Sequence, residues 1–167
     1  MPTVEILVRD ARPGDAESLA DIHAAAWREA YLGIIPRVEV ERMISRRGPV
    51  WWLNAVRRGK HIAVIDFAGH LAGYATFGRG RVAGLAQGEV YELYLQPEYQ
   101  GVGLGRRLFA ATRERLAKRR LAGVIVWSLA DNERACAFYR ALGGVEKAKA
   151  VERLGGVKLD KTAFVWS

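Results

Sequence analysis

The sequence predicts a mixed α/β (α+β) fold. We expect a single domain, residues 1–167, with one central sheet of about seven mixed, mostly antiparallel strands flanked by about four helices. The length and a hydrophobic content of 50% suit one ordinary core. Segments in which apolar and polar residues alternate, as in strands, are interspersed with segments whose apolar residues recur at helical period. Residues 89–129 are expected to form a strand, a glycine loop, a helix and a second strand, in that order.

The first half of the chain predicts a strand, helices and a hairpin. The expected elements are a strand at 4–9, a helix after the turn at 12–15 that runs to about Tyr31, one helix at 38–58 interrupted at Gly48-Pro49, and strands at 61–67 and 71–77 joined by the turn 68–70. Residues 78–88 are rich in glycine and basic residues without periodicity, which predicts a loop.

The second half predicts the core of the sheet. The expected elements are a strand at 89–96, a helix at 105–120, a buried strand at 124–129, a helix at 133–142 and a closing hairpin of strands 145–153 and 159–166. Asp131 or Asn132 can cap the second of these helices, and Gly143-Gly144 ends it.

Composition narrows the classes of function. A net charge of +8 and a pI of about 10.0 favour anionic partners without choosing among them. The one cysteine, Cys136, cannot form an internal disulfide, and neither it nor the three histidines have metal-ligand spacing, so no metal is expected. No signal segment and no apolar run of the roughly 18–20 residues that span a membrane is present, so we expect a cytoplasmic protein without a membrane partner.

The loop Gln100, Gly101, Val102, Gly103, Leu104, Gly105 is the strongest chemical signal. It joins a strand to a helix, so unobstructed backbone amides meet a helix N-terminus and form an anion site suited to a pyrophosphate. A tight turn without a ligand is the alternative. No P-loop string occurs, and the dinucleotide fingerprint fails because its last glycine is Arg106 or Leu108, depending on the start.

Three segments in the same order resemble the GNAT superfamily of N-acetyltransferases. Gln100-x-x-Gly103-x-Gly105 is similar to the cofactor motif of that family, and residues 89–99 resemble the strand that precedes it. Residues 132–143, with Asn132, Ala135, Phe138-Tyr139 and Gly143, are similar to the second signature. The resemblance implies a GNAT-like fold and transfer of an acetyl group from acetyl-CoA to a primary amine by direct attack in a ternary complex.

The resemblance also implies where acetyl-CoA lies. Its pyrophosphate would meet the amides of residues 100–105, with Arg106 adding positive charge. Its pantetheine arm would pair with the backbone of Leu93, Tyr94 and Leu95, and Asn132 would assist that arm.

Three side chains are candidates for the chemistry. Tyr139 resembles the tyrosine that protonates the departing thiolate in many members of the family; at helical spacing it is otherwise a core residue. An ammonium acceptor must lose a proton before it attacks, so a base is expected. Glu89 and Glu92 are the candidates, with Glu89 slightly preferred. Their spacing puts them on opposite faces of a regular strand unless a bulge intervenes, and the strand of the family is bulged here.

The acceptor is not identified by the sequence. Trp27 and Tyr31, with Trp51 and Trp52, offer an aromatic wall to an amine on a small molecule or a peptide, and they can equally be packing. Two other functions compete with this one. The first is a non-catalytic acyl-CoA-binding or sensor domain of the same fold. The second is a nucleic-acid-binding protein, but the chain contains no recognised nucleic-acid-binding module, so no nucleic-acid partner is expected. A homodimer and acyl groups longer than acetyl both stay open.

Overall fold

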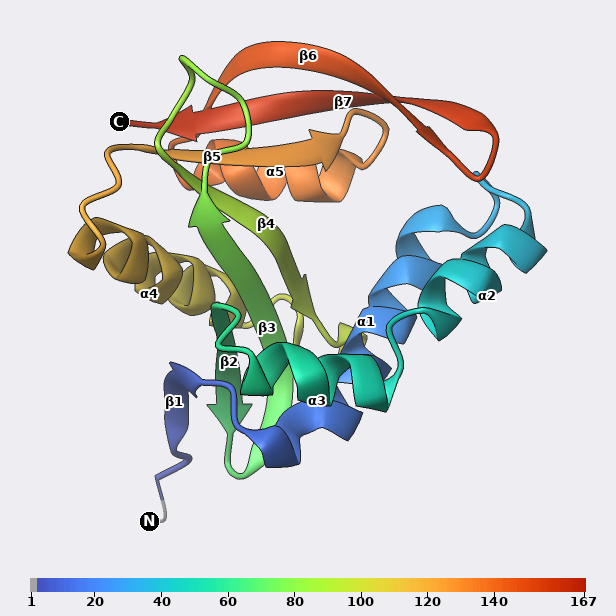
Figure 1. Cartoon of the computed structure of the whole chain (residues 1–167). Coiled ribbons are helices and arrows are strands. Elements are labelled where there is room, and N and C mark those ends of the chain that lie inside the picture. Colours follow the sequence, from blue (N-terminus) through green and yellow to red (C-terminus); the bar gives the residue numbers. More distant parts are fainter. Residues whose placement is uncertain (1–2) are drawn as a thin grey trace.

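The computed structural model describes residues 3–167, and its strands form one mixed sheet. The strand order is β1-β2-β3-β4-β5-β7-β6, and every neighbouring pair is antiparallel except β4 and β5, which are parallel (Figure 1). The strands are β1 (Ile6–Asp10), β2 (Ile62–Phe67), β3 (His70–Arg79), β4 (Gly88–Leu95), β5 (Val124–Leu129), β6 (Val145–Leu154) and β7 (Val157–Trp166). The predicted fold class, with seven mostly antiparallel strands, is confirmed.

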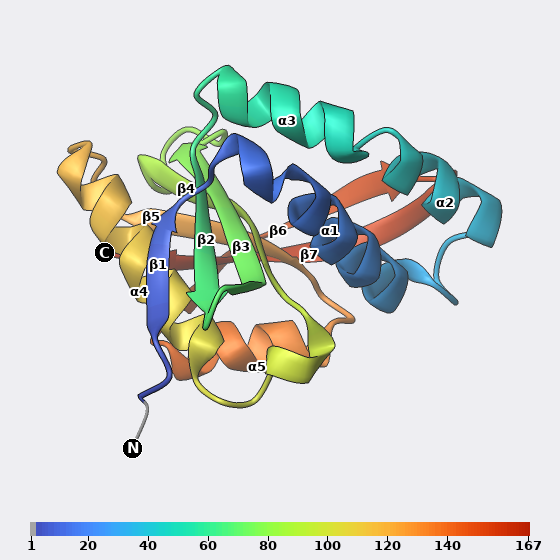
Figure 2. The same cartoon turned by 90° about the horizontal axis from the view of Figure 1, so that it is seen from below.

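Helices cover both faces of the sheet. They are α1 (Ala16–Tyr31), α2 (Arg37–Ser45), α3 (Pro49–Arg57), α4 (Leu104–Lys118) and α5 (Glu133–Ala141), with short 3-10 turns η1 (Pro13–Asp15) and η2 (Pro97–Tyr99). Figure 2 shows α1 and α3 on one side of the sheet and α5 on the other. The buried apolar residues form two main clusters accordingly, one between the sheet and α4 with α5, and one between the sheet and α1 with α3.

The segment predicted as one interrupted helix forms two separate helices, so the structure has five rather than about four. The chain leaves α2 at Ser45, and Gly48 adopts an extended conformation before α3 begins at Pro49. Proline has no backbone N–H and is favoured in the first turn of a helix, which explains the new start. The turn between the two helices carries Arg47.

The predicted loop at 78–88 is shorter than expected. Strand β3 continues through Gly78 and Arg79, which pair with Glu89 and Gly88 of β4. Strand pairing overrides the weak local propensity of glycine here, because the long hairpin supplies a hydrogen-bonding partner. The loop proper therefore covers residues 80–87.

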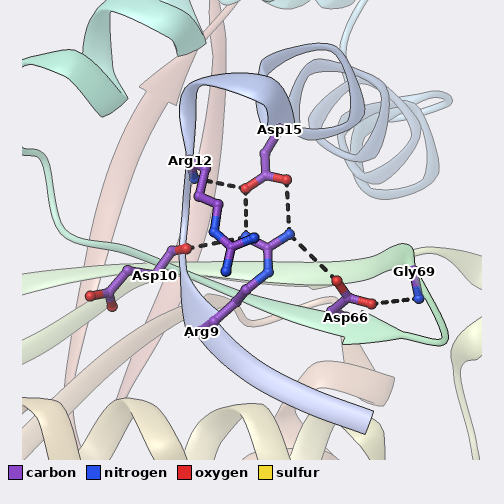
Figure 3. Close-up of polar contacts among 6 residues, drawn as sticks. All are labelled: Arg9, Asp10, Arg12, Asp15, Asp66 and Gly69. Carbon is purple, nitrogen blue, oxygen red and sulfur yellow. Dashed lines mark hydrogen bonds and ion pairs between the residues drawn. The ribbon is translucent and has the colours of Figure 1, made fainter. Parts of the chain in front are cut away.

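An arginine network ties the N-terminal strand to the rest of the domain. The guanidinium of Arg9 donates to both carboxylate oxygens of Asp15, at 2.8 and 3.0 Å, and lies 3.5 Å from Asp66 (Figure 3). Asp66 accepts from the amide of Gly69 in the β2–β3 turn. The end of β1 and the turn before α1 are thus joined to the β2–β3 hairpin, which is distant in sequence.

Two features of the sheet prepare a site. Strands β4 and β5 pair only at Gly88–Glu89 with Val124–Ile125 and then diverge, as Figure 1 shows. The tip of the β6–β7 hairpin meets the connection between α1 and α2, where Leu154, Val157 and Leu159 join a small apolar cluster around Ile35 and Val40. Within residues 3–167, no helix has both the length and the apolar character that a bilayer crossing needs.

Candidate active site

A cleft of about 840 Å³ opens where β4 and β5 diverge. Its walls come from α1, β4, the glycine loop, β5 and the start of α5. The residues that line it are Ala26, Glu29, Ala30, Tyr31, Ile34, 91–95, Gln100, Gly101, Gly103, Gly105, Arg106, 126–129, 131–135, Phe138, Tyr139, Ala141 and Leu142. Because the two strands diverge, the edge of β4 that faces β5 has no partner strand after Glu89 among the described residues. The peptide groups on this edge are available to a ligand.

The glycine loop forms one end of this cleft. Gly101 and Gly103 have φ values of 79° and 83°, a left-handed conformation that side-chain-bearing residues rarely adopt. Gly103 is the N-cap of α4, whose first amides have no acceptor within the helix. A methyl group on Gly105 would lie 3.2 Å from the ring of Phe138, so this glycine allows α4 to pack closely on α5. The loop thus presents free amides at a helix N-terminus, as an anion site requires.

Charge at this end is also favourable to an anion. The first turn of α4 contains no acidic residue, and Arg106 lines the cleft. Arg107 instead donates to the backbone carbonyl of Ile6 at 3.2 Å, which turns it toward β1.

The other predicted cofactor residues divide into two groups. Leu93, Tyr94, Leu95 and Asn132 line the cleft with the loop residues. Asn132 is the N-cap of α5 and accepts from the amide of Ala135 through its side-chain oxygen, at 3.0 Å, which leaves its amide hydrogens for other partners. Val102 and Leu104 do not line the cleft: the Val102 side chain is exposed, and Leu104 is buried beneath the loop.

A bulge in β4 puts both candidate glutamates on one face of the sheet. Val90 pairs with Phe77 and Glu92 pairs with Thr76, so Tyr91 is an extra residue without a partner on β3. One extra residue reverses the alternation of side chains, and Glu89 and Glu92 therefore both face the α1–α3 layer.

The two glutamates nevertheless occupy different environments. The Glu89 side chain is 1% exposed and is not among the residues that line the cleft. It accepts from the backbone amide of Arg81 at 3.0 Å and from its guanidinium at 2.6 Å. Glu89 thus anchors the 80–87 loop to the sheet.

Glu92 lines the cleft and is held by four hydrogen bonds. Arg47 donates to its two oxygens at 3.0 and 2.8 Å, and the hydroxyls of Tyr74 and Thr76 donate at 3.1 Å each. The Arg47 guanidinium lies over the rings of Trp51 and Trp52, at 4.4 and 4.7 Å from their centroids. Glu92 is therefore a carboxylate fixed in the wall of the cleft and paired with Arg47.

Tyr139 lies in the wall of the cleft on α5 and is 7% exposed. Burial, with a smaller contribution from Cys136, raises the pKa of Tyr139 well above its usual range. The structure records no hydrogen bond from its hydroxyl among residues 3–167. The phenol consequently stays protonated at physiological pH, as a proton donor must.

The aromatic residues predicted to contact the acceptor also fall into two groups, those that line the cleft and those that do not. Tyr31 lines the cleft, and burial together with Glu152 and Glu92 raises its pKa to about 12. Trp27 lies behind it, with ring centroids 4.7 Å apart, and does not line the cleft. Trp52 is fully buried in the core between α1 and α3.

Several site residues have no distinctive signal in the sequence. Arg47, Tyr74 and Thr76 hold Glu92 from two other parts of the chain, and only the register of β3 against β4 reveals the last two. Ala26 and Ala30 line the cleft one helical turn apart, where small side chains leave room.

The fold and the cleft define an α/β domain with a glycine-loop anion site between diverging strands, and comparison with known proteins identifies its family. Residues 17–143 match the Acetyltransferase (GNAT) family. The chain therefore belongs to this family and is an N-acyltransferase, as the three motifs predicted.

Individual relatives agree with the family. The chain is 29% identical over 163 residues to the uncharacterized N-acetyltransferase YuaI of Bacillus subtilis, covering 96% of this chain and 92% of that protein. It is 48% identical over 58 residues to the mycothiol acetyltransferase of Kocuria rhizophila, but covers only 19% of its length. The structure of yncA from Salmonella typhimurium, a putative acetyltransferase with its cofactor acetyl-CoA, has a TM-score of 0.69 at 21% identity, covering 96% of this chain and 92% of that one.

Proposed function

We propose that this protein transfers the acetyl group of acetyl-CoA to a primary amine by direct attack in a ternary complex. The observation that carries the proposal is that one cleft is lined by a glycine loop at a helix N-terminus, by a fixed carboxylate and by a protonated tyrosine. Bound acetyl-CoA would supply an activated thioester. The chain supplies binding, orientation and proton transfer.

The residues of the cofactor end fit such a ligand. The amides of Gly101, Gly103 and Gly105 with Arg106 would hold the phosphates, because free N–H groups, a helix N-terminus and a cation all favour negative charge. The unpaired edge of β4 at 93–95 and the amide of Asn132 would hold the pantetheine arm through hydrogen bonds. Val102 and Leu104 would support the loop rather than contact the ligand through their side chains.

Tyr139 would protonate the departing thiolate. Its raised pKa makes the phenol a weaker acid than in water, but a thiolate that develops in the same desolvated cleft is a stronger base for the same reason. Burial therefore raises both the pKa of the phenol that gives up the proton and the pKa of the thiol that forms when the thiolate accepts it.

Glu92, rather than Glu89, would act on the amine. Its carboxylate would receive the proton of the amine, directly or through water. Two of its four donors are hydroxyls, which can accept as well as donate, so Tyr74 and Thr76 can reorient when Glu92 becomes protonated. Both glutamates pair with an arginine, but Glu89 lacks access to the cleft, whereas Glu92 lines it.

The proposal is tested by titrating the protein with acetyl-CoA in a calorimeter and then screening amine libraries for release of free thiol. We expect binding, and thiol release with one class of amine, small molecule or peptide. Glu92→Gln should lower kcat by about tenfold or more, whereas the matched variant Glu89→Gln should change it little. Binding without thiol release for any amine would support a non-catalytic sensor domain instead, and failure to bind acetyl-CoA would refute the proposed function.

A further inference from the structure

Every buried side-chain nitrogen or oxygen that lacks a hydrogen-bond partner, among residues 3–167, lies in one cluster. The atoms are both ring nitrogens of His23, the indole nitrogens of Trp27 and Trp52, and Nε of Arg47. Buried polar groups in folded proteins are nearly always paired, and leaving several unpaired would cost a large share of the stability of a domain. Their concentration in one place indicates a common ligand.

The four side chains adjoin one another and include Arg47, the arginine that binds Glu92. His23 is fully buried on α1, and its ring centroid lies 5.3 Å from that of Trp27 and 6.0 Å from that of Trp52 on α3. The guanidinium carbon of Arg47 is 4.7 Å from the Trp52 ring. None of the four lines the cleft, so the cluster is separate from the space in which cofactor and acceptor would bind.

The chemistry of the cluster selects the ligand. The two indoles and Nε of Arg47 are donors only, and a neutral imidazole offers one donor and one acceptor. Burial, with a smaller effect of Arg47 that Glu92 opposes, lowers the pKa of His23 to about 4, so the ring is neutral at physiological pH. The charge of Arg47 is already balanced by Glu92, which removes the attraction for an anion. A neutral molecule that accepts as well as donates is required, and about two water molecules could accept from the four donors.

We propose that ordered water fills a buried compartment bounded by His23, Trp27, Arg47 and Trp52, and that through this water His23 is a positioning residue for Glu92. The water would accept from Nε of Arg47 and donate to His23. Arg47 would thereby be held from both sides, by Glu92 at its two terminal nitrogens and by water at Nε. The second part of this inference rests on the proposed function; the first part does not.

The compartment itself is tested by a crystal structure at a resolution that shows ordered water, and by magnetisation transfer from water to the indole N–H protons in solution. We expect water within hydrogen-bonding distance of at least three of the five nitrogens, and transfer to the Trp27 and Trp52 signals. A compartment that is dry, that contains another molecule, or whose nitrogens pair with protein atoms would overturn the inference.

Variants of His23 give an independent test that needs no substrate. If the ring binds water, His23→Leu removes the anchor of that water and lowers the melting temperature by several degrees, while His23→Gln, which keeps a donor and an acceptor, lowers it less. If the ring nitrogens are unpaired in a dry core, His23→Leu relieves their desolvation and raises the melting temperature, which would contradict the proposal. Should His23→Leu fail to fold, Trp27→Phe supplies the same comparison with one donor removed.

The positioning role is tested with the acceptor that the thiol-release screen identifies. His23→Leu should lower kcat several-fold and leave the KM for acetyl-CoA unchanged, and His23→Gln should recover most of the rate. An unchanged kcat in His23→Leu would refute the positioning role. If the wild-type protein transfers no acetyl group at all, the proposed function fails, whereas the water compartment still stands or falls by the crystal structure and the melting temperatures.

Discussion

The two ends of the cleft are built in opposite ways. The cofactor end, as we propose it, consists of backbone groups from one continuous loop, residues 100–105, at the start of α4. The acceptor end, the proposed amine site around Glu92, consists of side chains from the α2–α3 turn and β3 that bind this glutamate of β4. A backbone site tolerates variation of side chains but not of glycines, whereas a side-chain site depends on long-range packing. Under this proposal, local sequence recognises the ligand common to the family, and tertiary contacts recognise the ligand particular to one member.

Substitution of one loop glycine should give the largest effect. Gly103→Glu forces a side chain into a left-handed position and places negative charge where the phosphates would bind. We expect the Kd for acetyl-CoA to rise by about 1,000-fold, roughly 4 kcal/mol, measured by calorimetry. The control is Gly84→Glu, which adds the same strain and charge at φ 86° in the 80–87 loop. Equal loss of binding in both variants would show that strain, rather than the anion site, is responsible.

Acid should destabilise the acceptor end through His23. Its pKa is about 4 in the folded protein and 6.5 when unperturbed, so between these values the unfolded chain binds a proton that the folded chain excludes. Stability is therefore full above pH 6.5 and falls by about 3 kcal/mol as the pH drops to about 4. Chemical denaturation across this range, compared between the wild type and His23→Gln, measures the difference. Parallel curves for the two proteins would contradict the assignment.

Loss of the proposed acid should separate binding from chemistry. Tyr139→Phe keeps the packing against Phe109 and Phe164 and removes only the hydroxyl. We expect kcat to fall by about 100-fold while the Kd for acetyl-CoA is unchanged. Tyr99→Phe, at a tyrosine that packs on Phe67 outside the cleft, is the matched control and should retain the rate. A Tyr139→Phe enzyme with normal kcat would exclude the role of general acid.

The smallest expected effect is a difference in the free energy of unfolding between variants of two arginine–glutamate pairs. Arg47→Ala leaves the largely buried Glu92 without its main counter-charge and should lower the free energy of unfolding by about 2–3 kcal/mol. Arg28→Ala breaks the exposed pair with Glu41, where both side chains are nearly half exposed, and should change stability little because solvent screens the pair. Urea titrations of both variants give the comparison. Similar losses would mean that burial does not set the strength of the Arg47–Glu92 pair.

The difference between the two ends also explains what could be predicted. The fold class, the seven strands and the cleft-lining loop glycines followed from local patterns, because period-2 alternation and glycines before a helix carry their meaning within a few residues. The preference for Glu89 as the base is not supported by the geometry, because strand alternation does not show that the 80–87 loop binds Glu89 and that only Glu92 lines the cleft. The break predicted at Gly48-Pro49 in the helix at 38–58 is present, but it separates two helices rather than interrupting one, because Pro49 begins a new helix.

By itself, the sequence determined the order of elements, the family and the position of the glycine loop before α4, since these depend on hydrophobic period, on motif order and on glycines that free the backbone. Only the tertiary structure decided which residues meet at the acceptor end. The bulge at Tyr91 moves Glu89 and Glu92 to one face, and the break before α3 brings Arg47 to Glu92. The tertiary structure also gathers the unpaired nitrogens around His23. Such contacts join residues up to 45 positions apart, and the free energy that selects them comes from packing of the whole domain.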